Sequence, residues 1–295
     1  MGKGIISSPD SNVIGKANVT ITDGNPRLLL VNGHWNKMLH KIDGAPGEGG
    51  QNYWLFFLGR SLNNFLSTAK QYFGDSNYQS EPIYIDGSTK WGGDENGNQR
   101  KNRGYQYAQE HFKEIAKGIG TRKIYIISHS EGGAFAAGIA KYLIEKGIEV
   151  GESIMLAADE GDEFTVEGNY HCYQIVGGWL SSYMDIQTRK KKNVFAIDPV
   201  VRDNMIKGVD KYGVCIINNA GLFTVHGGII NQNIFNIINQ LKTVKVLQAF
   251  SSKGKIIYYA EPDNSEIWHK INNTYVHNKR IDSYFDNFTQ KFRID

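Results

Sequence analysis

The sequence predicts an α/β fold, in which helices cover both faces of a doubly wound, mostly parallel sheet. Short apolar runs of strand length recur along the chain, and stretches with apolar residues at the helical period lie between them. In addition, residues 123–133 combine a β-branched apolar run, an abrupt reversal and the start of a helix. Strands that alternate with helices in this way pair in parallel, and ligands then bind beyond their carboxyl ends.

The composition limits the classes of function. The 295 residues, 40% hydrophobic and 21% charged, suffice for a large globular core, and a net charge of +3 argues against nucleic-acid binding. The one basic run, 189–192, is interpreted as a solvated loop, with a weak peripheral membrane contact as the alternative. Cys172 and Cys215 form neither a disulfide framework nor a metal-ligand pattern, so we expect reduced thiols, no cofactor and no metal.

Three regions are expected along the chain. Residues 1–25 are polar and rich in Gly, Asn and Asp, which is typical of a lead-in without a core. Residues 26–242 carry the alternating strands and helices, and 243–295 change to short strands with turn signals, which predicts a small antiparallel extension. No segment has the pattern of a signal peptide or reaches 18 apolar residues, so a cytoplasmic protein is expected, with signal-independent secretion left open.

The elements before the central run follow from their spacing. Leu58, Leu62, Phe65 and Ala69 recur at the helical period, and a second apolar stripe follows between residues 105 and 119. In chain order we expect a buried strand over 27–33, a helix over 54–73, a strand over 82–86 and a helix over 105–119, with Gly-rich loops over 41–51 and 88–103.

The central run has the pattern of a nucleophile elbow, Gly-x-Ser-x-Gly. Residues 124–127 are a continuous apolar strand, Ser130 stands at the reversal, and 134–146 form a helix rich in small residues. The serine of such an elbow lies on a strained turn, so the residues two before and two after it must be small. Here Ser128 takes the first glycine position and Gly132 the second.

The elements after the elbow helix are less regular. We expect strands over 153–158, 194–197 and 214–218 and a helix over 229–241. The intervening segment, 159–193, is long, aromatic-rich and without a clear period. It is interpreted either as a lid over a binding site or as ordinary packing helices.

A serine hydroxyl needs a base to become a nucleophile, and the base needs an acid that orients it. The chain offers Ser130, Asp198 and His226 in the order serine, acid, histidine. Asp198 ends an apolar strand, and His226 lies in a loop that opens a helix. Asp159 is the alternative acid, because it too follows an apolar strand. His129 would point away from the Ser130 hydroxyl and is interpreted as a packing residue.

Acyl transfer also requires backbone N–H groups that hold the developing oxyanion. One would come from Glu131, the residue after the serine, and the second from His34 or Trp35 in the loop after the first strand. Glu131 places a charge directly after the serine, which would favour a polar or cationic substrate if the carboxylate entered the pocket.

At these residues the chain resembles the α/β hydrolase superfamily, over about residues 27–242. Within it, the triplet 198–200, Asp-Pro-Val, followed by His226-Gly227, is similar to the lipase class 3 arrangement. It is also similar to the lipase-like C-terminal toxin modules of bacterial Rhs-type proteins, which are effectors. The resemblance implies a serine hydrolase that acts on carboxylic esters. Its substrate would be a small-molecule or lipid ester, with lipid or phospholipid esters favoured. Amidase, peptidase or acyltransferase chemistry on the same residues is the alternative, as is an inactive binding module.

Overall fold

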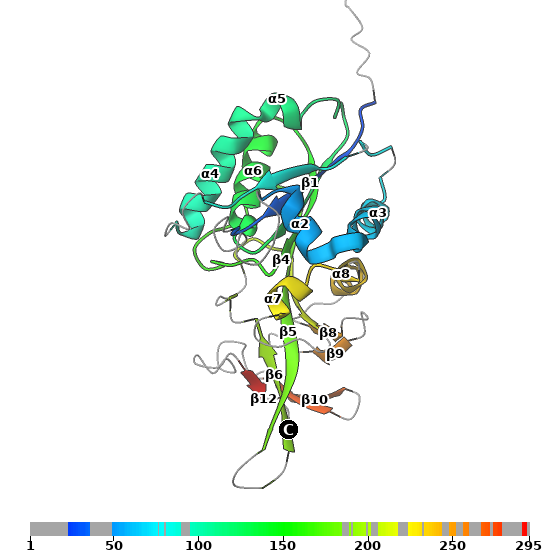
Figure 1. Cartoon of the computed structure of the whole chain (residues 1–295), viewed down its shortest axis with the longest axis vertical. Helices are drawn as coiled ribbons and strands as arrows, with labels where there is room; N and C mark the ends of the chain where they lie inside the picture. Colours follow the sequence, from blue (N-terminus) through cyan, green and yellow to red (C-terminus); the bar gives the residue numbers. More distant parts are fainter. Residues whose placement is uncertain are drawn as a thin grey trace, which may run out of the picture.

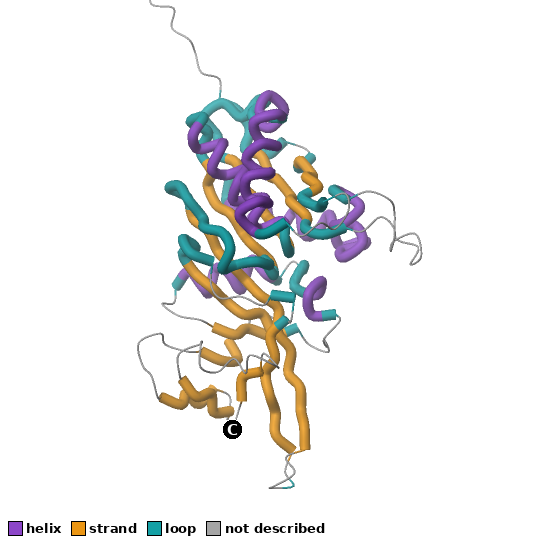
Figure 2. The backbone as a smooth tube through the Cα atoms, turned by 90° about the vertical axis from the view of Figure 1, so that its left-hand side faces the viewer, coloured by secondary structure: helices purple, strands orange, loops and turns teal. Residues whose placement is uncertain are grey.

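The computed structural model has an α/β architecture, with helices on both faces of a twisted sheet (Figures 1 and 2). It describes residues 23–35, 49–75, 77–79, 81–89, 95–184, 189, 191–198, 200–201, 206–217, 224–231, 233–243, 248–251, 256–259, 267–271, 274–278 and 291–293. The expected lead-in lies outside these residues up to residue 22, as does the expected Gly-rich loop over 41–48.

The sheet is parallel across its core. Within the described part of the chain, seven strands pair in parallel in the order β2-β1-β3-β4-β5-β7-β8. They are β1 (Arg27–Asn32), β2 (Ile83–Asp86), β3 (Ile124–His129), β4 (Val150–Leu156), β5 (His171–Met184), β7 (Lys211–Ile216) and β8 (Gln248–Ser251). The β-branched run of β3 therefore lies inside the sheet, where Ile127 pairs with Leu30 on one side and Ile154 on the other.

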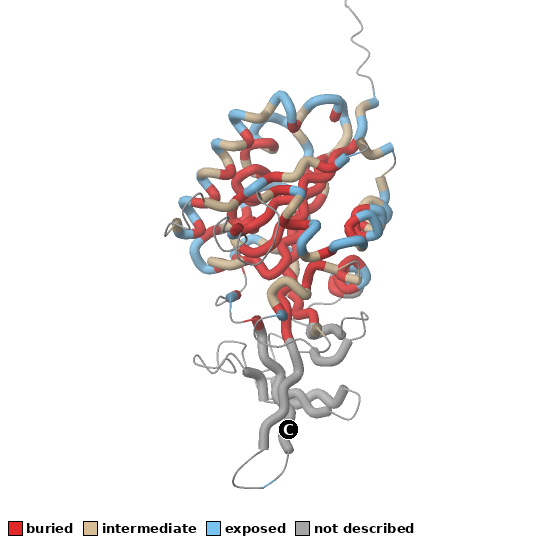
Figure 3. The backbone as a smooth tube through the Cα atoms, in the orientation of Figure 1, coloured by how far each residue is buried: buried red, intermediate tan, exposed pale blue. Residues whose placement is uncertain are grey.

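The helices bury the two faces of this sheet. One face is covered by α2 (Gln51–Leu58), the 3-10 turn η1 (Gly59–Ser61), α3 (Leu62–Phe73) and α8 (Ile234–Lys242), and the other by α4 (Gly97–Glu110), α5 (Phe112–Ile115) and α6 (Gly132–Glu145). Alternation along β1 supplies both cores, because Leu28 packs on the first face and Leu29 on the second. Buried residues accordingly concentrate in the sheet and on the inner sides of the helices (Figure 3). None of the described helices is long and apolar enough to cross a bilayer.

Helix α4 begins earlier than the sequence suggested, since the expected loop over 88–103 includes its first two turns. Asn96 and Gln99 form a capping box: each side chain accepts a hydrogen bond from the other's backbone N–H, at 2.9 Å in both cases. Two glycines then bring α4 against α6. A Cβ on Gly104 would lie 2.0 Å from the carbonyl oxygen of Phe135, and one on Gly138 would lie 1.8 Å from that of Lys101.

The expectation of an irregular segment over 159–193 is wrong for about half of its length. His171–Met184 is a strand, β5, whose first half pairs in parallel with β4 and β7. Its second half forms an antiparallel hairpin with β6 (Lys191–Ile197) that runs beyond the helical layers (Figure 1). The sequence suggested a loop because this strand contains Gly177-Gly178 and two serines, which are residues typical of loops. Whether any of 159–193 covers a site stays a prediction.

The hairpin brings the end of β6 back to the carboxyl edge of the parallel strands. Asp198, the residue after β6, donates its backbone N–H to the carbonyl of Gly177 at 2.9 Å. Beside it, α7 (Val225–Gly228) is a single turn that packs on β5. Two distant segments thereby reach the edge at which β3 ends.

The strands beyond residue 242 attach in several ways. β8 continues the parallel order, and β9 (Ile256–Tyr259) pairs with it antiparallel. β10 (Ile267–Ile271) and β11 (Thr274–Asn278) pair with each other, and β12 (Lys291–Arg293) pairs with β6. The domain boundary at 242 and a separate antiparallel extension stay predictions.

Candidate active site

Ser130 lies on a strained turn between β3 and α6. Its φ is +56°, a left-handed conformation that residues other than glycine adopt rarely. The turn is held by two backbone hydrogen bonds of 2.9 Å, from Ser130 N–H to the Leu156 carbonyl and from Gly133 N–H to the Ser130 carbonyl. At Gly132 a Cβ would lie 2.7 Å from the Val31 carbonyl oxygen, so this position excludes any side chain.

A histidine and a buried carboxylate meet at the same edge. Oδ2 of Asp198 lies 2.5 Å from Nδ1 of His226, and Oδ1 accepts the backbone N–H of Val200 at 3.0 Å. The Asp198 side chain is fully buried, whereas the His226 side chain is 20% exposed. A carboxylate only accepts hydrogen bonds, so Nδ1 carries the proton and Nε2 is the nitrogen that can take one up.

Asp159 has a different environment. Its carboxylate accepts the backbone N–H of the next residue, Glu160, at 2.9 Å in the loop that follows β4. The carboxylate hydrogen-bonded to His226 is therefore that of Asp198.

The loop after β1 lies directly against the elbow. A Cβ on Gly33 would lie 2.7 Å from the backbone nitrogen of Glu131 and 2.8 Å from Cβ of Ser130. The buried amide of Asn32 holds this loop: Nδ2 donates to the Gly33 carbonyl at 2.9 Å, and Oδ1 accepts from Gly50 N–H at 2.7 Å. The residues expected to supply oxyanion donors, 34 and 35, thus follow a glycine in contact with the elbow.

The two candidate donors of this loop differ in exposure. His34 is exposed, whereas Trp35 is 4% exposed and packs edge to face on Tyr53 and Phe56, with ring centroids 5.3 and 5.7 Å apart. Phe56 is itself 51% exposed, and Val200, two residues after Asp198, is 41% exposed. Exposed apolar side chains therefore flank both the loop 33–35 and Asp198.

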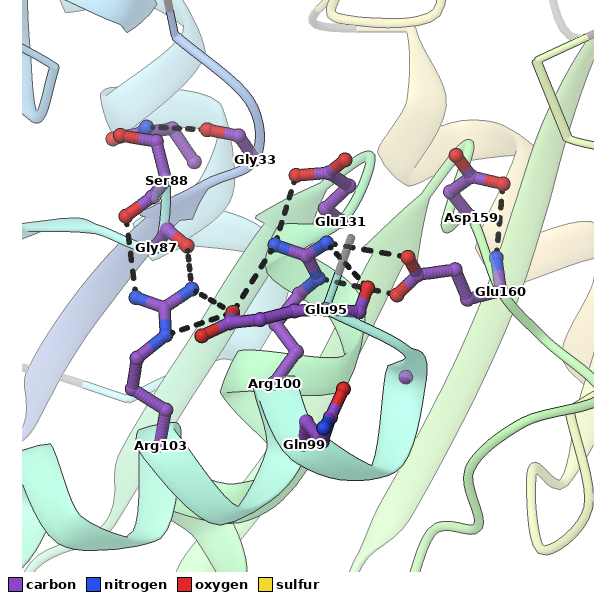
Figure 4. Close-up of polar contacts among 12 residues, drawn as sticks. Gly33, Gly87, Ser88, Glu95, Gln99, Arg100, Arg103, Glu131, Asp159 and Glu160 are labelled. Carbon is purple, nitrogen blue, oxygen red and sulfur yellow. Dashed lines mark hydrogen bonds and ion pairs between the residues drawn. The ribbon is translucent and has the colours of Figure 1, made fainter. Parts of the chain in front are cut away.

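The Glu131 carboxylate is paired with a buried cation. Arg100 of α4, 2% exposed, lies 3.0 Å from Glu131 and 3.1 Å from Glu160, and Glu95 completes the cluster at 3.7 Å (Figure 4). Burial raises the pKa of the Glu160 carboxyl, an effect that Arg100 opposes. The Glu131 carboxylate is thus directed toward α4, where the positive charge of Arg100 neutralises it. Nothing in the spacing of Arg100 from the elbow signalled this contact.

His129 packs in the interior as expected, and it also forms two hydrogen bonds that the sequence did not indicate. It is fully buried at the end of β3 and hydrogen-bonds both the Tyr53 hydroxyl and the backbone carbonyl of His226, the latter at 2.9 Å. Its ring lies 4.6 Å from that of His226, centroid to centroid. The sequence carried no signal for this role, since Tyr53 and His226 are 76 and 97 residues away.

Comparison with known proteins adds little. No family model and no curated protein matches the chain. Among solved structures, a hyperthermophilic esterase from the archaeon Pyrobaculum calidifontis matches with 11% sequence identity and a TM-score of 0.28, over 78% of this chain and 69% of that one. A likeness of this degree carries no argument, so the functional assignment rests on the geometry of the site.

Proposed function

We propose that the protein is a serine hydrolase of the α/β hydrolase type that cleaves carboxylic esters, with lipid or phospholipid esters as the preferred class. One observation carries the proposal. The buried Asp198 carboxylate lies 2.5 Å from His226 at the sheet edge where Ser130 occupies a strained strand-to-helix turn. A serine is a weak nucleophile and requires such a base and orienting acid. The three residues also follow the order serine, acid, histidine that α/β hydrolases have along their chains.

In the proposed mechanism the Ser130 hydroxyl attacks the ester carbonyl and passes its proton to Nε2 of His226. Asp198 holds the imidazole in the required tautomer and stabilises its positive charge. The backbone N–H of Glu131, with that of His34 or Trp35, stabilises the oxyanion. His226 then returns the proton to the departing alcohol. Water attacks the acyl-enzyme while His226 accepts its proton, and the bond to the Ser130 oxygen breaks as that oxygen regains the proton, which releases the carboxylic acid.

Two features support an apolar acyl group. Phe56 and Val200 present exposed apolar surface beside the oxyanion loop and the acid. Glu131, the one charge inside the elbow, has Arg100 as its partner. The sequence resemblance to class 3 lipases and to Rhs-type toxin modules points the same way and forms part of the proposal.

The contact between Gly33 and the elbow gives a first prediction. Gly33→Ala should lower kcat for ester hydrolysis by about 10²-fold, because the new methyl group displaces the oxyanion loop from Glu131. Gly74→Ala is the control: its Cβ would meet nothing within 4 Å, so any strain comes from the backbone at φ +68° and not from a neighbouring segment. Steady-state kinetics with thermal melts should show lost turnover only in the first variant. Equal kinetics in both would remove the oxyanion role from this loop.

The substrate class is tested with 4-nitrophenyl esters from acetate to palmitate and the matching anilides. The value of kcat/KM should rise with acyl length, and Phe56→Asp should flatten that rise because it places a charge beside Trp35. Leu55→Asp adds the same charge one residue earlier on α2, at a position 39% exposed, and should keep the rise. Turnover confined to acetyl esters would reject the lipid class, and turnover of anilides alone would favour an amidase.

A further inference from the structure

We infer that His129 and Tyr53 form a positioning pair that holds helix α7, and with it His226, in place for catalysis. The inference rests on the proposed function, because it assigns the pair a task at the same site. Neither residue is placed to react with substrate. Both act through the backbone of the proposed base.

The hydrogen bonds determine which ring nitrogen of His129 carries a proton. A carbonyl oxygen only accepts, so Nε2, at 2.9 Å from the His226 carbonyl, must be the donor. In a neutral ring Nδ1 is then an acceptor, and the Tyr53 hydroxyl donates to it. Tyr53 thereby selects the one neutral tautomer of His129 that can hold His226.

The surroundings keep the His129 ring neutral. Complete burial lowers its pKa well below the usual range, and the charge that His226 can carry lowers it further. The ionisable groups that face the pair are His226 from α7 and Tyr53 from α2, with Glu131 and Asp86 acting on Tyr53. Neutrality matters because a second cation 4.6 Å from the His226 ring would oppose its protonation during the reaction.

Helix α7 depends on outside contacts, since a single turn of four residues has few hydrogen bonds of its own. Besides the bond from His129, it packs on α2 so closely that a Cβ on Gly227 would lie 2.2 Å from the Phe57 ring. The Tyr53 ring lies 5.0 Å from that of Phe57 and 5.3 Å from that of Trp35. The same tyrosine therefore contacts the oxyanion loop and supports the base.

The test compares His129→Leu, His129→Gln and Tyr53→Phe, with Tyr78→Phe as the matched control. Tyr78 carries a buried hydroxyl without a hydrogen-bond partner among the described residues. A glutamine Nε2 can replace the donor at Nε2 of histidine, whereas leucine cannot. Each variant is assayed for kcat and KM on the best ester, for thermal unfolding, and for the downfield Nδ1 proton of His226 by NMR of ¹⁵N-histidine-labelled protein, assigned by its loss in Asp198→Asn.

We expect His129→Leu to lower kcat about 30-fold with little change in KM, because a small displacement of the base disturbs the reacting geometry but not the contacts that bind substrate. The His226 proton signal should broaden or disappear in that variant. His129→Gln should restore the signal and most of the turnover, Tyr53→Phe should weaken both to an intermediate extent, and Tyr78→Phe should match the unmodified protein.

The NMR signal is recorded without substrate, so the two proposals fail separately. Absence of ester hydrolysis in the unmodified protein rejects the proposed function, while the signal still judges the positioning pair. A signal unchanged in His129→Leu overturns the inference, as does a folded His129→Gln variant in which signal and turnover are lost as in the leucine variant. If His129→Leu does not fold, an unchanged signal in Tyr53→Phe overturns it equally.

Discussion

Ser130→Ala is expected to lower kcat for ester hydrolysis by about 10³-fold or more while leaving the protein folded. The hydroxyl is the proposed nucleophile, and alanine fits the same backbone at φ +56° with a strain similar to that of serine. Single-turnover kinetics and a thermal melt measure the two effects. Ser153→Ala, a buried serine on the neighbouring strand β4, is the control and should keep its turnover. Comparable activity in the two variants would remove Ser130 from the chemistry.

Asp198→Asn is expected to lower kcat by about 10³- to 10⁴-fold with little change in KM. An asparagine amide can donate to Nδ1 of His226, which reverses the tautomer and leaves Nε2 without a lone pair on the productive side. The replacement preserves volume, so the fold should persist.

Asp159→Asn is the matched control for this prediction. Its carboxylate accepts the Glu160 backbone N–H, a contact that an asparagine oxygen can keep, and turnover should remain within about threefold of the unmodified protein. The reverse ranking of the two variants would transfer the acid role to Asp159.

The elbow was predictable from sequence because its determinants are local. A β-branched strand, a serine and two glycines within ten residues specify the strand, the reversal and the helix together. The apolar runs before Ser130 and Asp198 likewise indicated that both residues would follow strands. Local patterns of this kind need no knowledge of the rest of the fold.

Other elements depended on contacts that no window of sequence contains. Helix α4 starts with a capping box in polar, glycine-containing sequence, which has the composition of a loop. β5 contains Gly177-Gly178, where the strand leaves the parallel sheet for its hairpin, so its period was obscured. The length of that hairpin determines that Asp198 lies beside Gly177 at the sheet edge. This length follows from the pairing of β5 with β6, which the sequence does not reveal.

The supporting residues of the site were equally hidden. Arg100 reaches Glu131 because two glycines bring α4 against α6, and His129 reaches His226 because α7 packs on α2. In both cases a buried polar side chain finds its partner through tertiary packing, which sequence spacing does not encode.

The proposed nucleophile is tested most directly by covalent labelling with a fluorophosphonate, followed by mass spectrometry of the intact protein and its peptides. This reagent reacts with a serine only when a neighbouring base activates it, and it does not require the natural substrate to be known. We expect one adduct per chain, on the peptide that contains Ser130, with loss of the adduct in Ser130→Ala and much slower labelling in Asp198→Asn. An unlabelled protein, or an adduct on another residue, would contradict a Ser130-centred hydrolase.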